Sequence, residues 1–169
     1  MSGQRGNAGN ILVDLSRQVL LVRHPDRPEV SFPVSTARQG AGEQADSFQT
    51  PRGRHYIRAC IGGGMPSGSV FVGRRPTGEI YSHALATEHP DRDWILSRIL
   101  WLCGCEPGRN RLGRVDSMRR YIYIHGTPDT EPMGVPASHG CIRMRNQDVI
   151  SLFAMVAPGT PVEILEGES

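Results

Sequence analysis

The sequence predicts a mostly β domain with one main helix near its end. Short apolar runs alternate with turn residues along most of the chain. Glycine and proline contribute 20 and 13 of the 169 residues, and only one segment has convincing helical periodicity. Short strands separated by Gly- and Pro-rich turns are typical of sandwiches and barrels. We therefore expect one domain, a β-sandwich of mixed sheets.

The N-terminal part predicts a flexible start and a first hairpin. Residues 1–9 are polar and Gly-rich, so we expect the folded domain to cover residues 10–166. Two apolar runs between residues 10 and 24 predict a hairpin that turns at Ser16 and Arg17.

Further strands are expected before residue 105. The run 29–36 contains Pro33, which has no backbone N–H, so this strand should lie at a sheet edge. The runs 54–64 and 69–82 are separated by Gly-rich turns. Segment 93–104 has apolar residues at helical spacing, but its β-branched residues and its Asp and Gly boundaries favour a strand.

The end of the chain predicts a strand, the helix and a closing strand. In the run 120–126 the side chains should alternate, with Tyr121 and Tyr123 on one face and Ile122 and Ile124 on the other. Asn146 is expected to cap a helix over residues 147–157, whose apolar stripe comprises Val149, Leu152, Phe153 and Val156. Residues 161–166 should form the last strand.

Composition and charge exclude several classes of protein. The formal net charge of +2 is too small to indicate nucleic-acid binding. No run of about 20 apolar residues predicts a membrane span, and no N-terminal apolar run predicts a signal peptide. The four cysteines are not spaced as a disulfide framework, which favours a reducing compartment. We therefore expect a cytoplasmic protein, or a periplasmic one if the native start differs, with no nucleic-acid or membrane partner.

The candidate chemistry lies in two neighbouring stretches, YIYIHGT at residues 121–127 and SHGCIRM at residues 138–144. Cysteine is a nucleophile only as thiolate, and its free pKa is roughly 8.5, so it needs a base nearby. His125 ends a strand and is expected to be that base for Cys141. Gly140 allows backbone N–H groups around Cys141 to converge as an oxyanion hole. Arg143 would share a face with Cys141 and hold a substrate carboxylate.

Alternative interpretations remain open. A zinc site is possible in which His125, His139 and Cys141 are ligands, with Cys103 or Cys105 as the fourth, although these spacings are tighter than usual. Otherwise Cys60, Cys103 and Cys105 are expected to be packing residues. Of the remaining histidines, we expect His24, His55 and His89 to be surface or turn residues. His83 could line a cleft.

The two stretches together resemble the catalytic signature of the L,D-transpeptidases, the YkuD-type domain. The signature is a His-Gly, a loop of a dozen or so residues, then Ser/Thr-His-Gly-Cys and an Asn or Arg. The Thr-Pro-Arg-Gly turn at residues 50–53 also fits the family. The resemblance covers about residues 10–166, and it implies that residues 80–120 are a variable insertion that forms a lid.

The resemblance also implies roles for individual residues. Cys141 matches the nucleophile and His125 its base, and the carbonyl of Gly126 would orient the imidazole. Ser138, His139 and Gly140 match the turn that shapes the site. Substrate carboxylates would be bound by Arg143, Arg120 and Arg98, and an Arg cluster at residues 109, 111, 114, 119 and 120 is also placed to meet them.

The implied substrates are peptidoglycan stem tetrapeptides, cleaved between an L-centre and the terminal D-alanine without a cofactor or metal. From the expected cytoplasmic location we predict an L,D-carboxypeptidase that releases D-alanine during peptidoglycan recycling. The alternatives are a periplasmic L,D-transpeptidase that forms 3–3 cross-links and, less favoured, an inactive peptidoglycan-binding module. Carbapenems are expected to acylate Cys141.

Overall fold

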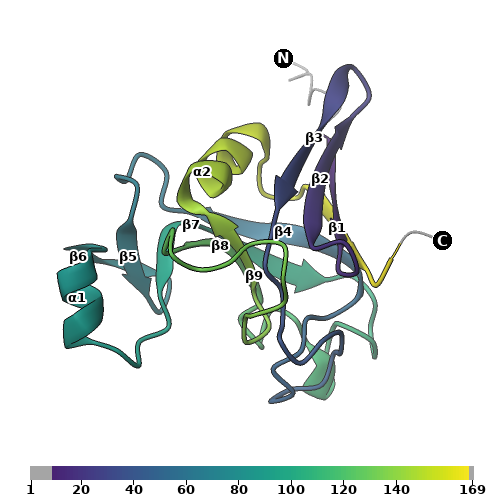
Figure 1. Cartoon of the computed structure of the whole chain (residues 1–169). Coiled ribbons are helices and arrows are strands. Elements are labelled where there is room, and N and C mark those ends of the chain that lie inside the picture. Colours follow the sequence, from purple (N-terminus) through teal and green to yellow (C-terminus); the bar gives the residue numbers. More distant parts are fainter. Residues whose placement is uncertain (1–8, 168–169) are drawn as a thin grey trace.

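Ten strands form one mixed sheet in the computed structural model, which describes residues 9–167 (Figure 1). Most of the predicted flexible N-terminus, residues 1–8, lies outside the described residues. The strands are β1 (Asn10–Asp14), β2 (Val19–His24), β3 (Arg27–Pro33), β4 (Gly53–Ile61), β5 (Ser69–Val72), β6 (Arg75–Ile80), β7 (Ile95–Gly104), β8 (Tyr123–Thr127), β9 (Ile142–Arg145) and β10 (Pro161–Leu165). The helical segments are α1 (His83–Glu88), a 3-10 turn η1 (Gly113–Val115) and α2 (Asn146–Met155).

The sheet curls until its two ends meet. The order β3-β2-β1-β10-β4-β7 continues through β8 to β9, and the β5–β6 hairpin also pairs with β7. The pairs β1–β10 and β8–β9 are parallel and the others antiparallel. Beyond β3, Ser35 exchanges two backbone hydrogen bonds of 2.9 Å with Arg143 of β9. The predicted mostly β fold of mixed strands is confirmed, as one curled sheet, and Pro33 lies in the edge strand β3.

The main core lies inside this curl. Ile11, Leu20, Ile57, Leu100, Ile124, Ile142 and Ile164 are fully buried there, each from a different strand. Helix α2 covers the core through Val149 and Leu152, which are also fully buried, and it packs on β7 and β8 (Figure 1). Within residues 9–167, no helix is long and apolar enough to cross a membrane.

Asn146 does not cap α2, so that expectation is wrong. The N-cap position is Arg145, which makes no side-chain cap, and Asn146 begins the helix with a buried side chain. Its amide accepts a hydrogen bond from the Ser97 hydroxyl at 2.5 Å and donates to the Thr127 carbonyl at 3.1 Å. Asn146 therefore ties α2 to β7 and to the end of β8, because it points inward rather than along the helix axis.

The alternation predicted for residues 120–126 holds only from Ile122 onward. Strand β8 begins at Tyr123, and Tyr121 has a left-handed backbone with φ of +56°. Tyr121 is therefore 55% exposed, whereas Tyr123 is 4% exposed. Ile122 and Ile124 both point into the main core as expected.

The expected lid segment, residues 80–120, includes part of the fold's centre. Strand β7 is confirmed as a strand and pairs with β4, β5 and β8. Helix α1 was not predicted, because six residues are too few for a periodic pattern; the Ser82 hydroxyl caps it by accepting from the Leu85 N–H at 3.0 Å. A lid could therefore include only the stretches on either side of β7, and the existence of a lid stays a prediction.

Candidate active site

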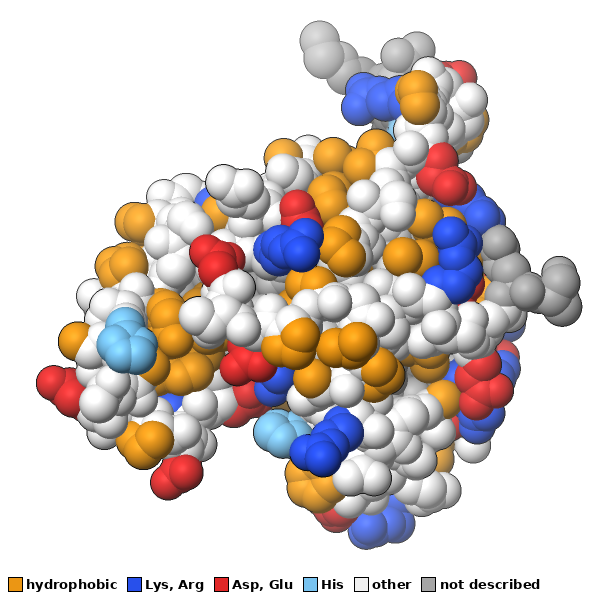
Figure 2. Space-filling view, viewed as in Figure 1, with side chains coloured by type: hydrophobic (Ala, Val, Ile, Leu, Met, Phe, Trp, Pro, Cys, Tyr) orange, Lys and Arg blue, Asp and Glu red, His pale blue; other side chains and the backbone are white. Residues whose placement is uncertain are grey.

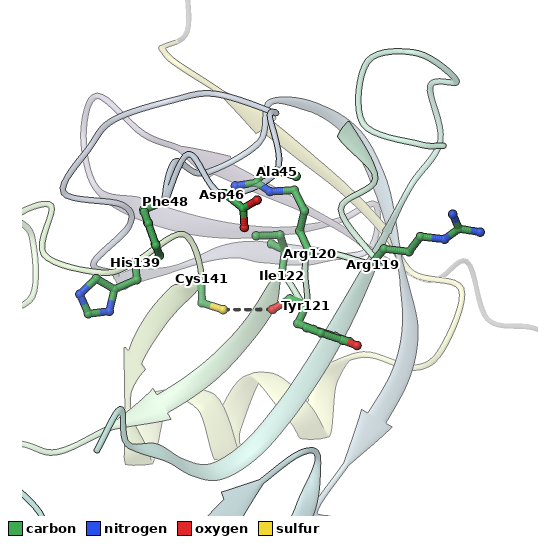
Figure 3. A pocket seen from close by; sticks show the side chains of 9 residues that line it. All are labelled: Ala45, Asp46, Phe48, Arg119, Arg120, Tyr121, Ile122, His139 and Cys141. Carbon is green, nitrogen blue, oxygen red and sulfur yellow. Dashed lines mark hydrogen bonds between the residues drawn. The ribbon is translucent and has the colours of Figure 1, made fainter. Parts of the chain in front are cut away.

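Cys141 lies in the turn before β9, at the wall of a cavity of about 300 Å³ (Figure 3). Its Sγ donates a hydrogen bond to the Tyr121 carbonyl at 3.4 Å and accepts one from the Tyr123 N–H at 3.4 Å. The cavity is lined by Ala45, Asp46, Phe48, Arg119, Arg120, Tyr121, Ile122, His139 and Cys141. The backbone of residues 121–123 thus fixes the sulfur at the cavity wall.

The surroundings of Cys141 favour the neutral thiol over the thiolate in the free protein. Burial raises its pKa to about 11, and the hydrogen bond from the Tyr123 N–H and the positive charges of Arg143 and Arg120 offset this only in part. The sequence led us to expect a thiolate held by histidine. Desolvation of the sulfur opposes this state, because it outweighs the nearby positive charge and favours the protonated thiol.

His125 lies in β8 and is 1% exposed. Its Nδ1 is 2.7 Å from the Gly126 carbonyl oxygen. A carbonyl only accepts, so Nδ1 carries the hydrogen and Nε2 has a free lone pair. Burial is the main cause that lowers the pKa of His125, so the imidazole is neutral too.

Strand register places the two reactive groups on one face. In the parallel pair β8–β9, His125 is opposite Arg143 and Ile124 is opposite Ile142. Side chains of paired residues point to the same face, and positions two apart on a strand share that face. Cys141 precedes Ile142, so it lies on the face of His125. The charges of Asp93 and Arg143 act on the pKa values of both groups, which is consistent with this proximity.

The Cα of Gly126 lies where there is no room for a side chain. A Cβ at this position would lie 2.5 Å from the Leu96 carbonyl oxygen and 2.7 Å from Asn146 Oδ1. Both contacts are closer than real Cβ atoms approach, so β8 and β7 pack here only with glycine. The close packing sets the position of the carbonyl that orients His125.

The turn from Ser138 to Cys141 is held by its own hydrogen bonds. The Ser138 hydroxyl donates to the Cys141 carbonyl at 2.6 Å and accepts from the Gly140 N–H at 3.2 Å. Gly140 has φ of +128°, a left-handed value that favours glycine. Because the Gly140 N–H is already bonded inside the turn, the donors for an oxyanion must come mainly from the neighbouring peptides.

His139 is not buried in the turn, contrary to the structural role we expected for its side chain. It is exposed and meets Phe48 edge-to-face, with ring centroids 6.3 Å apart. It lines the cavity at Cys141 and also two adjoining cavities of about 510 Å³ and 210 Å³. The side chain therefore faces the space where a ligand would lie.

These three cavities form what we call the His139 groove. Phe48 and Ser138 contribute to its middle part, and Asp93, Trp94 and Arg143 to its far part. Figure 2 shows a notch in the molecular surface, with histidine, acidic and basic side chains at its border. Cys141 lines the first of these cavities, and His139 lines all three.

Of the three predicted substrate-binding arginines, Arg120 and Arg98 are engaged within the protein. The Arg120 guanidinium lines the cavity but donates to the carbonyls of Gly42, Glu43 and Gln49, the shortest at 2.7 Å, so it holds that loop. Arg98 lies elsewhere, buried and stacked 5.4 Å over the Phe153 ring, and donates to the Met65 carbonyl at 2.9 Å.

Arg143 lines the far part of the groove. It is 9% exposed, and its guanidinium contacts the Asp93 carboxylate at 3.2 Å and the Ala137 carbonyl at 3.4 Å. The wider arginine cluster does not act together. Arg109 pairs with Glu106 at 3.3 Å and Arg114 with Asp46 at 3.6 Å, and Arg119 points away from the sulfur in Figure 3.

Sequence reasoning missed four groups that shape the site. Thr50 donates to the Gly140 carbonyl at 3.0 Å, and its only signal was the Thr-Pro-Arg-Gly turn. Arg74 donates to the Tyr123 hydroxyl at 2.9 Å and lies 5.0 Å over the Tyr121 ring, so it supports the segment that holds the sulfur. Phe48 and Asp93 gave no signal, because both come from irregular segments.

The zinc interpretation finds no support in the placement of its ligands. Among residues 9–167, no group of three His, Cys, Asp or Glu side chains is arranged to hold a metal ion. Cys103 is buried in β7, and His139 turns toward Phe48.

His55 was expected at the surface but is 2% exposed, and its Nε2 accepts a hydrogen bond from the Ser117 hydroxyl at 2.8 Å.

A thiol at a cavity wall and a buried, oriented imidazole on the same face of two paired strands form the arrangement that nucleophilic cysteine catalysis needs. The L,D-transpeptidase catalytic domain (YkuD) matches residues 8–164. The chain therefore belongs to the L,D-transpeptidase family.

Curated relatives match over about a quarter of the chain. A putative L,D-transpeptidase YkuD of Bacillus subtilis is 46% identical over 46 residues, 27% of this chain and 28% of that protein. A probable L,D-transpeptidase YbiS of Escherichia coli is 43% identical over 47 residues, 28% of this chain and 15% of that protein. The matched region thus spans less than a third of either relative.

Solved structures share the fold over nearly the whole chain. An L,D-transpeptidase from Mycobacterium smegmatis aligns with a TM-score of 0.53 and 17% identity, over 93% of this chain and 58% of that one. L,D-transpeptidase 3 from Mycobacterium tuberculosis, in complex with a faropenem-derived adduct, aligns with a TM-score of 0.56 and 18% identity, over 94% and 60%. At these identities the likeness concerns the fold.

Proposed function

We propose that this enzyme transfers the acyl group of peptidoglycan stem tetrapeptides through Cys141, at the bond between an L-centre and the terminal D-alanine. The observation that carries the proposal is the neutral pair on one face of β8 and β9. Cys141 supplies the sulfur, and His125 supplies the free lone pair of Nε2. The hydrogen bond from His125 Nδ1 to the Gly126 carbonyl fixes the orientation of the ring. Family membership supports the substrate class.

Each step uses groups of this chain. As the sulfur attacks the carbonyl carbon, the thiol proton moves to His125 Nε2, so thiolate and imidazolium form together in the complex. The oxyanion accepts hydrogen bonds from the N–H groups of His139 and Cys141, since that of Gly140 is used by Ser138. His125 then gives its proton to the departing amine of D-alanine, which leaves a thioester on Cys141.

The thioester can be resolved in two ways. An incoming amine would give a cross-link, and water would give a tripeptide; in both, His125 takes a proton from the attacking group. The His139 groove supports an amine acceptor, because the cavities on either side of His139 leave room for a second peptide. The carboxypeptidase expected from the sequence remains the competing proposal, as does its cytoplasmic location.

Product analysis of the full chain tests the proposal. Pure enzyme is incubated with a stem tetrapeptide, alone and with a second tetrapeptide whose side-chain amine is free, and products are separated by mass. Free D-alanine in either reaction supports acyl transfer at the predicted bond. Tripeptide as the main product supports the carboxypeptidase, and 3–3 dimers support the transpeptidase. Absence of D-alanine release with folded enzyme would contradict the proposal and favour an inactive binding module. Cell fractionation tests the location separately.

A further inference from the structure

The carboxylate-binding arginine of the groove already holds a carboxylate of the protein. Arg143 Nη2 contacts Asp93 Oδ1 at 3.2 Å, and the two side chains differ sharply in burial. The side chain of Arg143 is 10% exposed, whereas that of Asp93 is 53% exposed. Asp93 therefore reaches a buried cation from the solvent side, along the route that a ligand would follow.

The segment that carries Asp93 contacts β9 through the ion pair with Arg143 and β6 through the ion pair of Arg92 with Glu79 at 2.9 Å. Asp93 lies between α1 and β7 in an irregular stretch. The ion pair with Arg143 connects this stretch to β9. Trp94, the next residue, is 5.1 Å from the Tyr81 ring and has the Arg92 guanidinium 4.9 Å above it. The cavity of about 210 Å³ is lined by Asp93, Trp94 and Arg143, so the ion pair faces the groove.

The position of Arg143 suits the terminal carboxylate of a bound stem. Arg143 is two residues after Cys141 on an extended strand, which separates their Cα atoms by about 6.6 Å on the same face. In a peptide whose scissile carbonyl meets the sulfur, the C-terminal carboxylate lies one residue further. The guanidinium is thus within reach of that carboxylate, provided that Asp93 gives way.

We propose that Asp93 occupies, in the empty enzyme, the place on Arg143 that the terminal carboxylate of the donor peptide takes on binding. This inference rests on the proposed function and adds the recognition step to it. Exchange of one carboxylate for another keeps Arg143 paired throughout, so no buried charge is left alone. The exchange also releases the 90–94 stretch from β9, which opens the groove only for peptides that end in a carboxylate.

The test compares two peptides on protein that binds but does not react. Cys141→Ala protein is titrated with a D-alanine-terminated tetrapeptide and with the same peptide as its C-terminal amide, and tryptophan fluorescence is followed because Trp94 adjoins Asp93. The same titrations are made with Asp93→Asn added, and with Glu88→Gln added as a control that removes an exposed carboxylate of α1 that does not line this cavity.

We expect Asp93→Asn to tighten binding of the carboxylate peptide by about two- to fivefold, the range that a partly exposed ion pair is worth. Binding of the amide should not change, and Glu88→Gln should alter the binding of neither peptide. Adding Arg143→Gln instead should abolish the difference between the two peptides. Weaker binding of the carboxylate peptide to the Asp93→Asn protein, or equal changes for both peptides, would overturn the exchange.

Failure of the two proposals gives different results. If wild-type enzyme releases D-alanine but Asp93→Asn does not change the preference for the carboxylate peptide, only the exchange is wrong. If wild-type enzyme releases no D-alanine and the Cys141→Ala protein binds neither peptide, both the exchange and the proposed function are wrong.

Discussion

The Thr50 hydroxyl donates a hydrogen bond of 3.0 Å to the carbonyl of Gly140, the residue that precedes Cys141. The same hydroxyl accepts from the Ala37 N–H at 2.9 Å. Thr50 is fully buried, so one side chain connects the loop before β4, the chain after β3 and the catalytic turn. The position of Cys141 therefore depends on a contact between residues that are 90 positions apart.

Thr50→Val should lower both stability and activity. Valine has nearly the shape of threonine but leaves two buried backbone groups without a partner, at a cost of about 1–3 kcal/mol for each group. A loss of 2 kcal/mol, as an order of magnitude, lowers the melting temperature by about 4–8 °C in a chain of this size. Thermal unfolding and the rate of D-alanine release measure the two effects. Thr77→Val, at an exposed position, is the control, and equal behaviour of both variants would contradict the role of Thr50.

His139→Ala should change substrate binding rather than folding. The side chain is exposed and its ring contact is with Phe48 at the groove, so its removal should shift the unfolding free energy by no more than about 0.5 kcal/mol. The KM for the tetrapeptide should rise while kcat changes less, since His139 touches the bound peptide and not the transferred proton. A large fall in melting temperature would instead restore the structural role expected from the sequence.

The neutral thiol and imidazole predict a particular pH dependence. Acylation needs unprotonated His125, whose pKa burial holds below its usual 6.5, so kcat/KM should stay constant through neutral pH and fall only below 6.5. Alkylation of Cys141 by iodoacetamide needs the free thiolate, so its rate should rise tenfold per pH unit toward about 11. Labelling that is already maximal at pH 7 would show a resting thiolate.

Buried His55 should make the fold sensitive to acid. Its pKa is lowered to about 4, mainly by burial, while the unfolded chain binds this proton below about 6.5. The unfolded state therefore binds more protons between these values, and stability falls as the pH drops through this interval, by roughly 3 kcal/mol in total. Urea unfolding at pH 7.5 and 5 measures the loss. His55→Gln should show a smaller loss than wild type, and His83→Gln, at an exposed position, the same loss.

The sequence predicted the strands because their signals are local, and it placed His125 and Cys141 on neighbouring elements for the same reason. Alternation and turn residues set β1, β2 and β4, and strand β7 was predicted from its β-branched residues despite helical spacing. The closeness of His125 and Cys141 followed from one strand, one loop and the next strand. Such features depend on residues near in sequence, so pattern and spacing are sufficient to find them.

The partners of charged side chains were beyond the sequence. Arg120 is engaged by the loop at residues 42–49, more than 70 positions away, and Arg98 by Met65 and Phe153. The neutral state of Cys141 also depends on how much protein surrounds the sulfur, which no motif records. Asp93 was missed because its relevance to the site depends on its ion pair with Arg143, which is 50 positions away in the sequence.

The most direct test is the mass of the protein during turnover. Enzyme mixed with a stem tetrapeptide is quenched in acid within milliseconds and measured intact, and a digest locates the added mass. We predict a tripeptide acyl group on Cys141, formed about 10²–10⁴-fold more slowly in the His125→Ala protein and absent from the Cys141→Ala protein. A carbapenem should add its mass to the same residue. D-alanine release by the Cys141→Ala protein, or an acyl group on any residue other than Cys141, would contradict Cys141 as the nucleophile.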